Sequence, residues 1–160
     1  MLGAALVNVA LNAGIAWLSV RGQRTVPLWP ARVVGGPSTF TDTVGTLFVL
    51  PLTTCLMCTT AVWRELRDGG LSPLARPAGV LGCALARLPA RRLRRGLVLG
   101  ALTTLALGPP VTLLLVVLHV GELSGQAFMV YKVGFAVALG ALVTPLIVVR
   151  AMVDDPRAPA

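Results

Sequence analysis

The chain has 160 residues, of which 56% are hydrophobic and only 12% are charged. Soluble domains of this size are usually about a quarter charged, so the composition excludes an ordinary water-facing surface and indicates a membrane protein. The formal net charge is +8. No aromatic residues interleave with the arginines to stack on bases, so we expect no nucleic-acid partner.

Four apolar segments follow one another along the chain. The first, residues 2–20, has no basic leader and no small-residue cleavage site before Arg21, so we interpret it as a retained helix and not as a signal peptide. The others cover residues 43–63, 96–118 and 128–149. Each approaches the roughly 20 residues that cross a bilayer as a helix, the form that satisfies the backbone internally.

The segments predict an all-α fold, a transmembrane four-helix bundle in a single domain over residues 1–153. The tail, residues 154–160, is expected to be disordered. Arg64 and Arg150 end the second and fourth segments, and Asp68 and Asp154 follow them, both at an offset of 86. This offset is compatible with two parallel-repeated helical hairpins, related by an axis along the membrane normal.

Basic residues set the expected orientation. Eight of the fourteen lie between Arg64 and Arg95, so the loop 64–95 is predicted to be cytoplasmic. Both termini are then cytoplasmic in an inner (plasma) membrane, and loops 21–42 and 119–127 face outward. We expect one group of side chains in the cytoplasmic loop to contact anionic lipid headgroups: Arg87, Arg91, Arg92, Arg94 and Arg95.

Three stretches carry a resemblance: V-P-L-W (26–29), T-D-T-V-G-T-L-F-V-L-P-L-T-T-C (41–55) and Y-K-V-G-F-A-V-A-L-G-A-L-V-T-P-L (131–146). With them the chain resembles uncharacterised bacterial integral membrane proteins built from short two-helix hairpin units. The resemblance implies fold and membrane localisation. It implies no activity, because none is known for such proteins.

Cys55 and Cys58 form a C-x-x-C motif inside the second segment. This spacing permits an exchangeable disulfide, but apolar surroundings suppress the reactive thiolate, and no second cysteine pair lies in an outer loop. Packing of small side chains at a helix interface is the favoured interpretation. His119 is the only histidine, and Met57 points away from Cys55, so we expect neither a metal site nor a cofactor.

Polar residues inside the apolar segments are candidates for helix–helix contacts. Asn8 and Asn12 lie one turn apart, and threonines such as Thr54 and Thr144 are possible partners. Such contacts stabilise helix packing by about 0.6–2 kcal/mol each. A polar path through the bundle is the alternative, and prolines 109, 110 and 145 could break helices as in transporters.

A charge cluster is predicted at the outer ends of the helices: Asp42, His119, Glu122 and Lys132. Lys132 lies one turn inside an apolar segment, where an unpaired charge is costly. We therefore predict that it contacts Asp42 or Glu122.

The sequence contains no nucleophile–base set, phosphate-binding loop or pair of intramembrane carboxylates. The leading hypothesis is therefore a non-enzymatic membrane subunit or scaffold, partnered by the lipid bilayer and by a second copy or another membrane protein. The alternatives are a small oligomeric transporter or channel, and a membrane thiol–disulfide oxidoreductase acting through Cys55 and Cys58.

Overall fold

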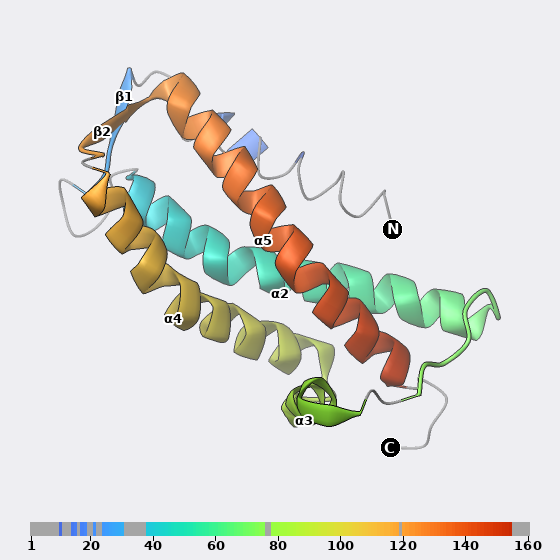
Figure 1. Cartoon of the computed structure of the whole chain (residues 1–160). Helices are drawn as coiled ribbons and strands as arrows, with labels where there is room; N and C mark the ends of the chain where they lie inside the picture. Colours follow the sequence, from blue (N-terminus) through green and yellow to red (C-terminus); the bar gives the residue numbers. More distant parts are fainter. Residues whose placement is uncertain are drawn as a thin grey trace.

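The computed structural model describes residues 24–30, 38–75, 78–118 and 120–154, together with residues 10, 14, 15, 17, 18 and 21. This part of the chain is mostly helical (Figure 1). Its elements are β1 (Thr25–Pro27), α2 (Thr39–Arg67), α3 (Gly79–Arg87), α4 (Arg92–Val117), β2 (Glu122–Ser124) and α5 (Gly125–Val153). Helices α2, α4 and α5 are each long and apolar enough to cross a membrane.

Helices α2 and α5 extend beyond the predicted apolar segments at both ends, and capping residues, not hydropathy, set where they begin. Helix α4 begins four residues before its predicted segment. Ser38 caps α2 by accepting a hydrogen bond from the Thr41 amide, and Ser124 caps α5 in the same way through Ala127. Each of these helices has 29 residues, or about 43 Å. The predicted first helix, residues 2–20, lies largely outside the described residues, so the bundle of four stays a prediction.

Helix α2 lies at the centre and packs against both α4 and α5, which crosses it (Figure 1). The core between them contains Leu47, Leu50, Cys55, Cys58, Leu99, Ala136, Leu139, Val143 and Ile147. Two glycines let α4 approach α2 closely. A Cβ at Gly100 would lie 2.7 Å from the Phe48 carbonyl oxygen, and one at Gly96 would lie 2.7 Å from the Leu52 side chain.

A proline in α2 creates a second tie to α4. Pro51 has no amide hydrogen, so the carbonyl of Leu47, four residues earlier, loses its intrahelical donor. The Thr103 hydroxyl of α4 lies 2.6 Å from the Leu47 carbonyl oxygen, nearer than its acceptors within α4, the carbonyls of Leu99 at 2.8 Å and Gly100 at 3.1 Å, and is placed to donate to it. Thr103 therefore supplies from a neighbouring helix the hydrogen bond that Pro51 removes.

The two predicted outer loops meet in a short antiparallel ribbon, which the all-α prediction did not include. Strands β1 and β2 pair with Val26 opposite Leu123. Three-residue strands carry too short an alternation to be recognised in a sequence. The pairing places both loops at the same end of the helices. This is the arrangement expected if both loops lie on the same side of a membrane.

The predicted loop 64–95 is largely ordered secondary structure. Helix α2 continues to Arg67, α3 occupies Gly79–Arg87, and α4 begins at Arg92. Between α2 and α3, the Leu74 amide donates to the Met152 carbonyl at 3.1 Å. The connection is thereby tied to the end of α5.

Helices α2 and α5 begin and end at equivalent positions, 86 residues apart in the sequence. They have equal length, their serine caps are Ser38 and Ser124, and their C-caps are Asp68 and Asp154. The amide of Asp68 donates to the Arg64 carbonyl, and that of Asp154 donates to the Arg150 carbonyl. Both helices run from the ribbon end to the arginine-rich end, as two parallel-repeated hairpins would.

Thr103→Val should destabilise the protein by about 1 kcal/mol, because it leaves the Leu47 carbonyl without a donor. The matched control is Thr104→Val, whose hydroxyl bonds within α4, to Gly100. Unfolding by SDS titration in mild detergent measures both. In a Pro51→Ala background the Leu47 carbonyl regains an amide donor, so the cost of Thr103→Val should shrink. An unchanged cost would contradict the pairing of Pro51 with Thr103.

Candidate functional site: charges held between apolar helices

Lys132, about two turns into α5, and Asp42, in the first turn of α2, form an ion pair, so the predicted contact is present. Lys132 is only 2% exposed. Its ammonium also lies 5.9 Å from the centre of the Phe128 ring, at the distance of a cation–π contact. Asp42 lies in the first turn of α2, where the helix dipole favours a negative charge.

A layer of hydroxyl groups lies beside this ion pair. Thr43 and Tyr131 share a hydrogen bond of 2.8 Å between α2 and α5, and Tyr131 stacks on Phe135. The Thr43 hydroxyl also lies 2.7 Å from the Thr39 carbonyl. Polar atoms at the ribbon end are thus used to join α2 to α5.

Of the four residues in the predicted charge cluster, the described structure brings together Lys132 and Asp42. Glu122 lies exposed in β2, and its carboxylate forms no ion pair with Lys132, so Asp42 is the partner. His119 lies outside the described residues. The reason for the difference is that β2 directs the chain away from the helix ends to pair with β1.

At the other end of the helices, Asp154 lies between two arginines. Its two carboxylate oxygens form ion pairs with Arg95 of α4 and with Arg150 of α5. Arg95 also donates from Nε to the Pro89 carbonyl at 3.0 Å and from Nη2 to the Ala90 carbonyl at 2.9 Å. One acidic residue thereby joins α4, α5 and the turn before α4.

Two predictions are corrected here. Arg95 is fully buried, so it cannot contact headgroups as expected. Asp154 caps α5 and binds both arginines, so the expected disordered tail cannot begin at this residue. Residues 155–160 lie outside the described part. The fourth residue after Arg150 is on the same helix face, which is the signal that could have assigned Asp154 to an ion pair.

The remaining arginines of the predicted headgroup set stay exposed at this end: Arg87, Arg91, Arg92 and Arg94. Arg92 also donates to the Thr60 hydroxyl at 2.8 Å. Their position suits a contact with anionic headgroups, which stays a prediction.

Both cysteines of the C-x-x-C motif are buried and free. Cys55 lies against α4, with its sulfur 3.5 Å from the Arg92 carbonyl oxygen. Met57 lies on an exposed face. Within the described residues no group of three or more histidines, cysteines and acidic residues could hold a metal ion.

Of the polar intramembrane candidates, Thr54 is buried in α2 and Thr144 is half-buried in α5. Asn8 and Asn12 lie outside the described residues. Another threonine of the apolar segments, Thr103, joins α4 to α2; its acceptor, the Leu47 carbonyl, was not predicted because it belongs to the backbone and not to a side chain.

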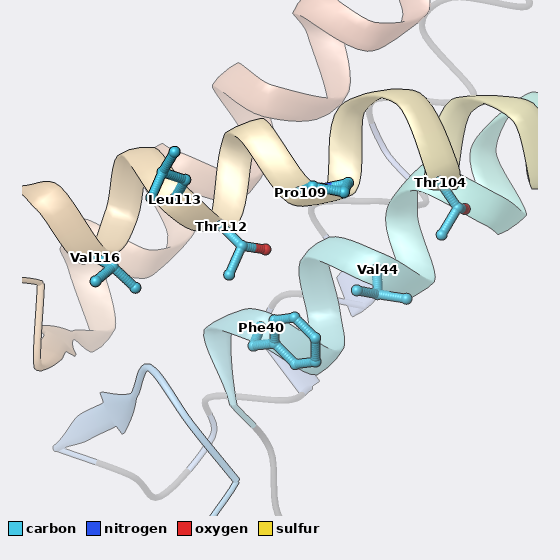
Figure 2. Close-up of a pocket in the computed structure, with 8 residues that line it drawn as sticks. Phe40, Val44, Thr104, Pro109, Thr112, Leu113 and Val116 are labelled. Carbon is cyan, nitrogen blue, oxygen red and sulfur yellow. The ribbon is translucent and has the colours of Figure 1, made fainter.

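A hollow of about 450 Å³ lies between the start of α2 and the second half of α4 (Figure 2). Phe40 and Val44 face Thr104, Pro109 and Thr112 across it. Its lining is mainly apolar and does not include Lys132 or Asp42. The hollow is therefore separate from the buried ion pair.

Lys132→Met alone should cost about 3–5 kcal/mol of stability, because it leaves Asp42 charged and unpaired in a largely buried site. The double variant Lys132→Met/Asp42→Asn should regain much of that loss. SDS titration in detergent measures the cycle, and Glu122→Gln, an exposed carboxylate at the same end, is the control. Equal losses in the single and double variants would contradict a coupled pair.

Asp154→Asn should destabilise the protein more than Asp68→Asn, its counterpart at the end of α2. Both substitutions change the same cap, but only the first leaves two arginines without a counter-charge. Removing one partner of a buried ion pair costs about 3–5 kcal/mol. Melting temperatures of the two purified variants compare them, and equal shifts would reduce Asp154 to a capping residue.

Comparison with known proteins gives no relative. No family model, no curated protein and no solved structure matches this chain.

Proposed function

We propose that this chain is a multi-pass protein of the inner membrane that acts as a non-enzymatic subunit or scaffold, through the packing of its helices. The supporting observation is that polar and charged side chains inside the long helices are used to join helices to one another. Thr103 joins α4 to α2, Lys132 joins α5 to α2, and Asp154 joins α5 to α4.

The outer faces of the helices support the membrane assignment. Helix α4 is the least buried of the three, and beyond the exposed Arg92 and Arg94 at its start its exposed side chains are apolar. The large ones are Leu93, Leu97, Val98, Leu102, Leu105, Leu113, Leu114, Val116 and Val117. A continuous apolar face of this length is unusual on a soluble monomer and suits contact with lipid or with a partner helix.

The orientation in this proposal follows from the arginines. Exposed arginines gather at one end, around α3, the start of α4 and the end of α2, and this end is cytoplasmic by the positive-inside rule. The ribbon end, with β1 and β2, then faces outward. Both termini are cytoplasmic in this arrangement.

A small oligomeric transporter is the second candidate, favoured by the hollow beside Pro109. Helix α4 is continuous, but the two prolines inside it and the two threonines in the lining are features that the interrupted helices of transport sites share. Four helices enclose little space, so this function needs several copies. A symmetric oligomer that mediates solute flux would favour it over the scaffold.

Native mass measurement of the protein, extracted in lipid nanodiscs from the cells that make it, tests the subunit role. A stoichiometric complex with a second membrane polypeptide supports that role. A protein that is always monomeric, or a homo-oligomer with solute flux, contradicts it. Leu105→Ala on the exposed face of α4 and Leu99→Ala in the core form a matched pair, since only the first should weaken a complex formed through that face.

Membrane insertion and orientation are tested by extraction and reporter fusions. The protein should stay in the membrane pellet after alkaline carbonate. A reporter placed after Arg76 should be active only in the cytoplasm, and one placed after Gly121 only outside, because exposed arginines flank the first site. A reporter after Arg76 that works only in the periplasm would refute the orientation.

A further inference from the structure

We propose that the N-terminal segment around Ala10–Leu18 packs on the open face of α5 in the way that α4 packs on α2. This inference assumes the membrane insertion proposed above. Its starting point is the observed α2–α4 contact, in which Gly100 lies against Phe48 and Gly96 against Leu52. At the offset of 86 that relates α5 to α2, the N-terminal segment, residues 2–20, lines up with residues 88–106, which include the first part of α4.

The repeat places small residues at the matching positions of the N-terminal segment. Gly14 corresponds to Gly100, and Ala10 corresponds to Gly96. Both Ala10 and Gly14 are exposed, and a Cβ added to Gly14 would meet no atom within 4 Å. The side of the segment that would permit a close helix contact is therefore open.

The matching positions on α5 are open as well. On α5, Gly134 corresponds to Phe48 and Ala138 corresponds to Leu52. Both of these α5 residues are exposed. One turn away, Val130, the counterpart of Val44, is 75% exposed. Under the same offset Leu18, which is 65% exposed, is the counterpart of Thr104, and Thr104 lies across the hollow from Val44 (Figure 2).

The chain path favours the protein's own N-terminal segment over a second copy. The Gly125 amide, at the start of α5, donates to the Arg24 carbonyl at 3.3 Å. Ten residues separate Gly14 from Arg24, and nine separate Gly134 from Gly125. A helix that runs antiparallel to α5 from this anchor can therefore bring Gly14 level with Gly134. The short connection also gives the segment a high effective concentration at this face.

Cysteine crosslinking in native membranes tests the contact, in a background of Cys55→Ala, Cys58→Ala and Cys83→Ala. The first pair is Gly14→Cys with Gly134→Cys, and the second is Leu18→Cys with Val130→Cys. The second pair leaves Gly14 and Gly134 unchanged, so it still reports the contact if cysteines at those two positions prevent close packing. A short bifunctional methanethiosulfonate links the thiols, and peptide mass analysis identifies the link.

The positive control is Thr104→Cys with Val44→Cys, the equivalent pair between α4 and α2. The negative control is Leu18→Cys with Leu102→Cys, an exposed position on α4. We expect a link within one chain for the N-terminal pairs, at a yield comparable to the positive control, and none for the negative control.

Two outcomes would overturn the proposal. One is the absence of any link for both N-terminal pairs while the positive control links. The other is a link that forms only between chains, when the two single-cysteine proteins are co-expressed, which would assign the α5 face to a second copy. Carbonate extraction of the same variants shows whether insertion itself has failed, so the two proposals are tested separately.

Discussion

The carbonyl oxygen of Leu47 is the group on which the arrangement of α2 and α4 depends. Pro51 removes its intrahelical donor, and in the proposed membrane setting no water is present to replace it. Thr103 can reach this oxygen only because Gly96 and Gly100 allow the two helix backbones to approach. Proline, threonine and glycines thus form one unit, and the close crossing of the helices follows from it.

The two ion pairs complete the connections among the long helices. Helix α5 is joined to α2 by Lys132 at the ribbon end and to α4 by Asp154 at the opposite end. Each connection lies at a different level along the bundle, so together they fix tilt as well as proximity. Between these levels Arg92 contacts Thr60 and Cys55, and the apolar contacts around them are less specific in register.

Hydropathy predicted the long helices because each contains an apolar stretch of roughly 20 residues, although the helices continue beyond that stretch to their caps. A charge inside an apolar segment predicted a contact of Lys132 with Asp42 or Glu122, because few acidic residues lie at that level. The partners of Asp154 could not be deduced in the same way. Arg95 belongs to a run of arginines, and only its contacts with Asp154 and with the turn before α4 distinguish it from its exposed neighbours.

The ribbon shows a different limit of sequence reasoning. Neither Thr25–Pro27 nor Glu122–Ser124 has a strand pattern of its own, and their pairing depends on helices that bring two distant loops together. Thr103 was hidden for a related reason, since a backbone carbonyl leaves no mark in the sequence. Pro51, which leaves this carbonyl without its helical donor, is visible in the sequence four residues after Leu47.

Under the predicted repeat, the two halves differ at this proline and this threonine. At the offset of 86, Pro51 corresponds to Val137 and Thr103 corresponds to Trp17. Val137 keeps its amide hydrogen, so the carbonyl of Val133 retains a donor within α5 and needs no hydroxyl from a neighbour. The proline and the threonine are thus absent together from the second pair of segments, while the small residues Ala10 and Gly14 are kept. A contact between the N-terminal segment and α5 would therefore depend on close packing alone.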